Sequence, residues 1–127
     1  MFARPRKAST IATVRGQNSA CEVLLMKRSS SDRFLPSYYV FPGGAVDAQD
    51  RITSGMPGYL YSGITSPEER NSLVTHIVAG IRETFEESGI LLARDDDGFT
   101  PESDETGFSI YRKKIYRGEL KFYDFIE

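Results

Sequence analysis

Three carboxylates near the end of one predicted helix have the residue type and the spacing that metal chemistry requires. They lie in the stretch Arg82-Glu83-Thr84-Phe85-Glu86-Glu87-Ser88-Gly89. Spacings of three and four residues place Glu83, Glu86 and Glu87 on one face of a helix. Two of the three fall in the last turn, where a negative charge costs about 0.3–1 kcal/mol. A hard divalent cation bound by the three carboxylates would offset this cost, because carboxylate oxygens are ligands that it prefers. A solvated acidic face is the alternative, and the spacing alone does not decide between them.

The helix that carries these carboxylates has start and stop signals in the sequence. Ser66 is a predicted N-cap, Pro67 takes the first helical position, and Glu69 follows three residues after the cap. Gly89 stands where a left-handed C-terminal cap falls. A mostly apolar face is expected to pack on a core, and it consists of Leu73, Val74, Ile77, Val78, Ile81, Phe85 and Ser88.

A resemblance decides how the acidic cluster is interpreted. The order Arg-Glu-x-x-Glu-Glu-x-Gly, followed by Ile90, resembles the second half of the Nudix box. The stretch Phe41-Pro42-Gly43-Gly44 resembles the loop that opens the box in many members of that family. This sequence departs from the box in three ways. Asp50 stands where the box has its first Glu, Thr84 takes an apolar position, and a long insertion separates Asp50 from Arg82.

The resemblance implies a hydrolase that cleaves a diphosphate with the help of Mg²⁺ or Mn²⁺. It implies that Glu86 and Glu87 are the principal metal ligands and that Glu87 belongs to the catalytic group. Glu83 would be a further ligand or the general base. Arg82 would take part in catalysis by orienting the carboxylates through ion pairs. The sequence thus yields a candidate catalytic and metal-binding set on one helix.

The glycine loop and the acid after it complete the candidate site that the resemblance implies. Gly43 and Gly44 free the backbone for positive φ or for a close approach to a ligand. We expect their backbone groups to shape the metal site and to admit the phosphates of a substrate. The resemblance implies a weaker supporting part for Asp50, although its side chain is shorter than that of the Glu in the box.

The residues before the glycine loop indicate a substrate class. The run Leu24-Leu25-Met26-Lys27-Arg28-Ser29, then Arg33 and Ser37, is similar to the signature of coenzyme A diphosphatases in this superfamily, from which Met26 and Ser37 depart. The resemblance implies hydrolysis of coenzyme A or acyl-coenzyme A to 3′,5′-ADP and (acyl-)phosphopantetheine. Arg28 and Arg33 would bind phosphates, because guanidinium groups hold phosphate oxygens bidentately. A pair of solvated loop charges is the alternative.

Other functions stay open at this point. ADP-ribose, nucleoside diphosphate sugars and dinucleotide polyphosphates are alternative small-molecule diphosphate substrates within the same superfamily. A truncated, non-catalytic Nudix fragment is a second class of function. A helical interaction module is a third, but it leaves the Phe-Pro-Gly-Gly loop unexplained.

Size and composition exclude several classes of protein. A chain of 127 residues supports one domain, and a net charge of −2 favours neither nucleic acid nor an anionic membrane as partner. Its apolar runs are too short for a membrane span. Cys21 is the single cysteine, so an internal disulfide is impossible and an intracellular, reducing compartment is expected. Residues 1–21 carry four basic groups and no acid, so they read either as a mitochondrial leader or as a basic lead-in to the first strand. Cytoplasm, mitochondrion and peroxisome all stay open.

The resemblance implies an α/β (α+β) fold, a Nudix-type mixed β-sheet packed against helices and incomplete in this chain. We expect residues 1–127 to form a single Nudix domain, the N-terminal portion of a longer enzyme or a truncated product. The predicted strands are 8–14, 21–26, 38–41 and 91–94, with a turn at 16–19. An insertion at 51–65 lies within the box, and a helical segment at 105–127 forms two helices broken near Gly118.

A few remaining residues are assigned structural parts. Cys21 is expected in the core. His76 is read as a stray surface histidine, and Asp95 to Asp97 as a solvated acidic turn. The stretch Tyr59-Leu60-Tyr61 could form a lid over a ligand or fold onto the body of the protein.

Overall fold

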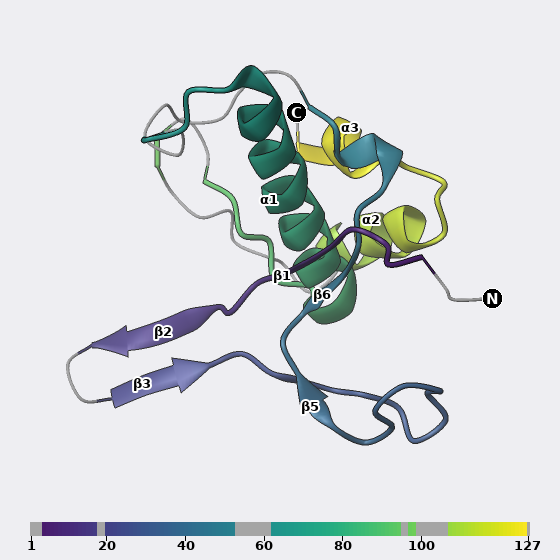
Figure 1. The fold of residues 1–127 in the computed structure, drawn as a ribbon. Coiled ribbons are helices and arrows are strands. Elements are labelled where there is room, and N and C mark those ends of the chain that lie inside the picture. The colour runs from purple at the N-terminus through teal and green to yellow at the C-terminus, as the bar shows by residue number, and fades with distance from the viewer. Residues whose placement is uncertain (1–3, 18–19, 53–61, 95–96, 99–106, 127) are drawn as a thin grey trace.

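Helix α1 (Pro67–Ser88) is the element on which the rest of the structure packs (Figure 1). Strands β1 (Ala8–Thr10) and β6 (Gly43–Ala45) cross it on one side. Helix α2 (Gly107–Tyr116) packs against α1, and helix α3 (Phe122–Ile126) contacts the short helix η1 (Ala48–Asp50). A computed structural model describes residues 4–17, 20–52, 62–94, 97–98 and 107–126.

The ends of α1 confirm the predicted caps. Ser66 has an extended backbone (φ −74°, ψ 128°), and its Oγ accepts a hydrogen bond from the amide of Glu69 at 3.4 Å. Gly89 closes the helix in the left-handed conformation at φ 79°, and its amide donates to the carbonyl oxygen of Phe85. The predicted apolar face is also confirmed, because Val74 and Val78 are buried in the core.

Six short strands form three two-stranded antiparallel sheets. The strands are β1 (Ala8–Thr10), β2 (Val14–Gln17), β3 (Ala20–Val23), β4 (Met26–Lys27), β5 (Tyr39–Val40) and β6 (Gly43–Ala45). β1 pairs with β6, β2 with β3, and β4 with β5. The chain therefore forms three stretches, 8–17, 20–27 and 39–45. Each stretch pairs with both of the others and uses different residues for each partner. The α/β class is confirmed, with short antiparallel ladders where we expected one mixed sheet.

The predicted first strand is broken because its two halves pair with different partners. In β1, Ser9 lies opposite Gly44, whereas Val14 at the start of β2 lies opposite Val23. Between the two strands, the amide of Ile11 still donates to the carbonyl of Pro42 at 3.1 Å. The amide of Leu24 likewise donates to the carbonyl oxygen of Thr13 at 3.0 Å, so backbone hydrogen bonds continue where the chain changes partner. This change brings the glycine loop against α1.

The core lies where α2 and α3 cover Phe85, which is fully buried. The Phe85 ring centroid is 6.0 Å from that of Phe108, 6.1 Å from that of Phe122 and 5.1 Å from that of Phe125. Such rings gain about 0.5–1.5 kcal/mol per pair beyond their burial. The predicted pair of helices broken near Gly118 is confirmed, because Gly118 has φ 71° and lies between α2 and α3.

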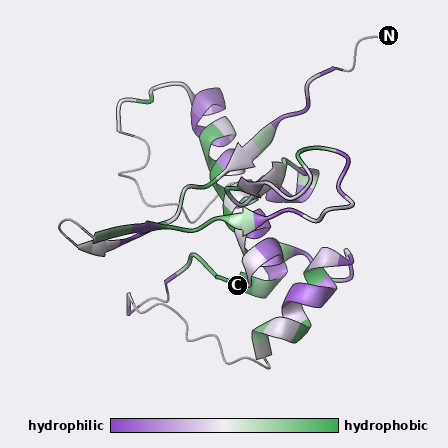
Figure 2. Ribbon diagram, turned by 90° about the horizontal axis from the view of Figure 1, so that it is seen from below, coloured by the Kyte–Doolittle hydropathy of each residue, from purple (hydrophilic) through white to green (hydrophobic). Residues whose placement is uncertain are grey.

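Two sequence predictions about apolar segments are wrong. Cys21 is exposed, because the hairpin of β2 and β3 projects from the body and no described segment covers its faces (Figures 1 and 2). Residues 91–94 do not form a strand, because no described strand pairs with them. Leu91 turns into the core cluster around Phe85 instead, where it is 9% exposed.

The insertion within the box is only partly described. It is preceded by a short 3₁₀ helix, η1 (Ala48–Asp50). Residues 53–61, and with them the question of a lid at Tyr59 to Tyr61, lie outside the described residues, as does Asp95-Asp96 of the acidic turn. Gly98 is in a turn at φ 83°, with Asp97 exposed beside it. Among the described helices, none combines the length and the apolar character that crossing a bilayer requires.

Candidate active site

Arg82 lies at the centre of the acidic cluster and is only 2% exposed. Its Nε donates to Asp50 Oδ1 at 2.8 Å and its Nη2 to Asp50 Oδ2 at 3.1 Å, a bidentate pair. Its Nη1 donates to Glu83 Oε1 at 3.0 Å and to Glu86 Oε1 at 3.1 Å. Burial opposes the charge on the guanidinium, but Asp50, Glu86 and Glu83 outweigh this and raise the pKa of Arg82. The predicted ion pairing of Arg82 with the carboxylates is therefore present.

Asp50 fixes the position of Arg82 through their buried ion pair. Its side chain is fully buried, and Oδ2 also accepts the amide of Asp47 at 2.7 Å within the turn of η1. The Nη2 of Arg82 reaches past Asp50 to the carbonyl oxygen of Ala45 at 3.0 Å. The shorter side chain suits this place, since the carboxylate contacts Arg82 and its own turn. Its contacts are those of a positioning residue.

The two glycines of β6 let the carboxylates of α1 approach the backbone. The amide of Gly43 donates to Glu87 Oε2 at 3.1 Å. A Cβ on Gly44 would lie 2.4 Å from Glu83 Cδ, and one on Gly43 would lie 2.4 Å from the carbonyl oxygen of Ser9. Neither glycine has a positive φ. The predicted positive φ is therefore absent, the close approach seen is that of the protein's own groups, and the approach of a ligand stays a prediction.

Replacing Gly44 with alanine is expected to lower the free energy of unfolding by about 1–3 kcal/mol, because the new methyl group overlaps the Glu83 carboxylate. Chemical denaturation of Gly44→Ala measures the loss. The control is a double-variant cycle with Glu83→Ala, which removes the overlapping atoms. A strong favourable coupling is expected, and additive losses would contradict the contact.

Glu86 and Glu87 are carboxylates held partly out of water. Burial raises the pKa of Glu86, while Arg82 opposes this shift. Burial also raises the pKa of Glu87, and the Gly43 amide opposes it. In the described residues, no three acidic, histidine or cysteine groups already converge to hold a metal ion. Glu83 and Glu86 instead each turn one oxygen, Oε1, to Arg82, which leaves Oε2 of each for a further partner.

The raised pKa values set a pH dependence for the metal-free protein. With pKa values above the ordinary 4.5, the folded state binds more protons than the unfolded state. The free energy of unfolding should therefore fall as the pH rises from about 4.5 through the pKa values of Glu86 and Glu87. Denaturation in EDTA across this range measures the slope. In Glu86→Gln/Glu87→Gln this slope should shrink, and an unchanged slope would contradict the assignment.

Arg112 is a functional neighbour that the sequence did not reveal. From α2 its Nε donates to the carbonyl oxygen of Glu86 at 2.6 Å and its Nη2 to that of Glu87 at 2.5 Å. These bonds satisfy orphan carbonyls at the end of α1 and bring a cation to its negative pole. The last turn of α1 contains two carboxylates and no basic residue. This pattern indicates that a cation from another element lies near the helix end. Nothing in the sequence identifies which one.

The structure brings only one of the two predicted phosphate-binding arginines to the cluster. Arg28, beside β4, is close enough to Glu87 to lower the pKa of that carboxyl, although burial prevails. Its Nε lies 3.2 Å from Asp32 Oδ2. Arg33 is exposed in the following loop and makes no ion pair with the described residues. His76 is half-buried and its Nδ1 bonds the carbonyl oxygen of Ser72 at 2.7 Å, so it belongs to the helix surface away from the cluster.

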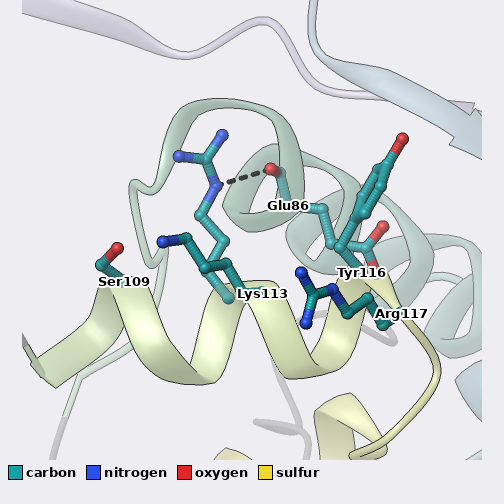
Figure 3. Close-up of a pocket in the computed structure, with 6 residues that line it drawn as sticks. Glu86, Ser109, Lys113, Tyr116 and Arg117 are labelled. Carbon is teal, nitrogen blue, oxygen red and sulfur yellow. Dashed lines mark hydrogen bonds between the residues drawn. The ribbon is translucent and has the colours of Figure 1, made fainter.

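A pocket opens beside the cluster, between the end of α1 and one side of α2 (Figure 3). Its volume is about 390 Å³, and its lining consists of Glu86, Ser109, Arg112, Lys113, Tyr116 and Arg117. The side chains of Lys113, on α2, and of Arg117, just after its end, project toward the side on which Glu86 lies (Figure 3). The arrangement places the carboxylate cluster beside a pocket lined by several cationic side chains.

Comparison with known proteins gives relatives of one superfamily. Acyl-coenzyme A diphosphatase NUDT19 of Xenopus laevis is 27% identical over 134 residues, which covers 80% of this chain and 35% of that protein. Its namesake in Gallus gallus is 35% identical over 95 residues, which covers 56% of this chain and 25% of that protein. The chain thus spans about a third or less of these curated relatives. No protein-family profile matches it.

A solved structure shows the same fold. The crystal structure of a Nudix hydrolase from Alicyclobacillus acidocaldarius superposes with a TM-score of 0.58 and 28% sequence identity. The match covers 93% of this chain and 57% of that one.

Proposed function

Because this chain belongs to the Nudix superfamily, we propose that it hydrolyses the diphosphate of a small molecule. The observation that carries the proposal is the set of three carboxylates on α1 that Arg82 and the glycine loop hold together. Glu83 packs on Gly44, and Glu87 accepts from the Gly43 amide. An acidic cluster whose only task was solvation would have no need for a buried arginine and a pair of glycines. The coverage of the relatives is partial, so the activity stays a proposal.

The donor set fits Mg²⁺ or Mn²⁺. All three groups are carboxylates, the hard oxygen ligands that Mg²⁺ prefers, and it retains several waters when bound. We assign Glu86 and Glu87 as principal ligands, and Glu83 as a further ligand or as the general base. When bound, such an ion neutralises phosphate charge and acidifies water. The desolvation of Glu86 and Glu87, seen in their raised pKa values, supports the assignment, because a cation would offset the cost of their charges.

Each residue of the cluster has a task in the proposed hydrolysis. Water adds across the diphosphate: its oxygen forms a new bond to one phosphorus while the bond from that phosphorus to the bridging oxygen breaks. Glu83, held by Arg82 and packed on Gly44, accepts the proton of the attacking water. The bridging oxygen leaves on the other phosphate. Arg82 keeps Glu83 and Glu86 oriented, and Asp50 keeps Arg82 oriented.

Coenzyme A or an acyl-coenzyme A is the substrate class that we propose. Two observations support it: the curated relatives are named acyl-coenzyme A diphosphatases, and Arg28, one of the arginines of the similar signature, lies near Glu87. The products are 3′,5′-ADP and (acyl-)phosphopantetheine. Arg28 would contact the phosphates on the Glu87 side of the cluster.

A substrate panel tests this function. The purified protein is incubated with Mg²⁺ or Mn²⁺ and either coenzyme A, an acyl-coenzyme A, ADP-ribose, a nucleoside diphosphate sugar or a dinucleotide polyphosphate, and products are separated by chromatography. We expect the coenzyme A compounds to be turned over fastest. The variant Glu83→Gln should lose about 10²–10⁴-fold in kcat, the usual contribution of a general base. Faster turnover of another diphosphate would overturn the substrate assignment.

A further inference from the structure

The pocket beside Glu86 carries positive charge that the proposed reaction does not use. Arg112 already donates to two carbonyl oxygens at the end of α1, whereas Lys113 makes no ion pair with the described residues. Arg117 lies 3.9 Å from Glu119, and both of these side chains are more than half exposed. An ion pair that is long and exposed stabilises little. Two cations of the lining are therefore available to a ligand.

The chemistry of the lining indicates a phosphate monoester. Lys113 and Arg117 supply charged donors, and the hydroxyl groups of Ser109 and Tyr116 supply neutral ones. The single acid of the lining, Glu86, already shares its charge with Arg82. A volume of about 390 Å³ is in the range of small-molecule pockets and exceeds what one phosphate fills. The ring of Tyr116, which is 77% exposed, offers a surface for the rest of the ligand.

The position of the pocket links it to the reacting centre. Glu86 belongs to both the carboxylate cluster and the pocket wall. A substrate with its diphosphate at the carboxylates can thus reach the pocket beside α2 with another of its groups. We propose that this pocket of α2 binds a second phosphate of the same substrate, a monoester separate from the diphosphate that is cleaved. The inference rests on the proposed function, in which that monoester is the 3′-phosphate of coenzyme A.

The decisive variant neutralises the two available cations. Lys113→Gln/Arg117→Gln changes one exposed side chain of α2 and one in the turn that follows it, and it spares Arg112, so the end of α1 keeps its cap. The matched control is Lys114→Gln/Lys121→Gln, which removes the same charge from exposed positions outside the pocket lining. A second variant, Lys113→Arg/Arg117→Lys, keeps both charges. Circular dichroism checks the folding of all three.

Binding tests the pocket without any need for catalysis. At constant ionic strength, calorimetry compares 3′,5′-ADP, which has the additional monoester, with 5′-AMP, which lacks it. The wild type should bind 3′,5′-ADP about tenfold more tightly or better, because a hydrogen bond to a charged group of this kind is worth at least that factor. Lys113→Gln/Arg117→Gln should lose this preference, and the control and the charge-keeping variant should retain it. Equal affinity of the wild type for the two nucleotides would overturn the proposal.

Turnover separates a failure of the pocket from a failure of the proposed function. The ratio of kcat/KM for coenzyme A to that for 3′-dephospho-coenzyme A should fall about tenfold in Lys113→Gln/Arg117→Gln. If coenzyme A is hydrolysed but this ratio stays at the wild-type value, the pocket proposal is wrong and the proposed function stands. If no diphosphate is hydrolysed but the preference for 3′,5′-ADP is present and lost in the variant, the pocket stands and the proposed function falls.

Discussion

Replacement of Arg82 with methionine is expected to lower the free energy of unfolding by about 3–5 kcal/mol, the usual loss when one partner of a buried ion pair is removed. Methionine keeps an unbranched apolar stem but lacks the guanidinium, so the change removes both the charge and the hydrogen bonds of Arg82. Asp50, which is fully buried, would keep its charge without a cation beside it. Glu83 and Glu86 would lose the donor that lies between them. Urea denaturation measures the change.

Two further variants show whether the loss comes from the buried charges. Arg15→Met removes an arginine whose ion pair with Glu22 is exposed, and its cost should stay below about 1 kcal/mol. Asp50→Asn added to Arg82→Met removes the stranded charge and should recover part of the stability. A small loss for Arg82→Met, equal to that of Arg15→Met, would show that Arg82 does not hold the cluster.

Replacement of both Glu86 and Glu87 with glutamine is expected to abolish stabilisation by metal. At a Mg²⁺ concentration of 100 times its Kd, binding to the folded state alone raises the wild-type free energy of unfolding by about 2.7 kcal/mol. Glu86→Gln/Glu87→Gln should show no such rise. Without metal the variant should be more stable than the wild type near pH 7, because burial disfavours the two charges that it removes. Thermal unfolding in EDTA and in Mg²⁺ measures both effects.

The variant should be more stable than the wild type without metal and should lack the stabilisation that Mg²⁺ gives the wild type. Only a change at a metal site is expected to produce both effects. The control is Glu68→Gln/Glu69→Gln, which makes the same charge change in the first turn of the same helix. Its metal response should match that of the wild type. Stabilisation of Glu86→Gln/Glu87→Gln by Mg²⁺ to the wild-type extent would place the ion elsewhere, and the absence of any response in the wild type would favour a non-catalytic fragment.

The candidate site depends on a division of tasks between charged residues. Arg82 and Asp50 are buried and contact one another, so they act as a framework. Glu83, Glu86 and Glu87 surround this framework at the surface, and Gly43 and Gly44 let the backbone come close to them. Arg112 then closes the end of α1 from the neighbouring helix. Three elements other than α1 therefore offset the cost of placing these carboxylates together: η1 with Asp50, β6 with its two glycines, and α2 with Arg112.

Most of what the sequence predicted correctly depends on neighbours along the chain. The caps of α1 at Ser66 and Gly89, its apolar face and the common face of its carboxylates follow from helical periodicity and local backbone preference. The break near Gly118 is local in the same sense. The turn before Cys21 was predicted at 16–19, but Gly16 and Gln17 belong to β2 of the hairpin. The predictions for Cys21 and for residues 91–94 failed because exposure and strand pairing depend on which distant segment covers or joins them.

The sequence by itself therefore determined the helix, the chemistry of its acidic face and the family resemblance. Only the tertiary structure decided what surrounds that face. The bonds that define the site join residues far apart in the chain: Arg82 and Asp50 are 32 positions apart, Gly43 and Glu87 are 44 apart, and Arg112 and Glu86 are 26 apart. Contacts of this kind arise when strands and helices pack, and no local preference of the residues involved specifies them. The pocket of α2 beside Glu86 is a product of the same packing.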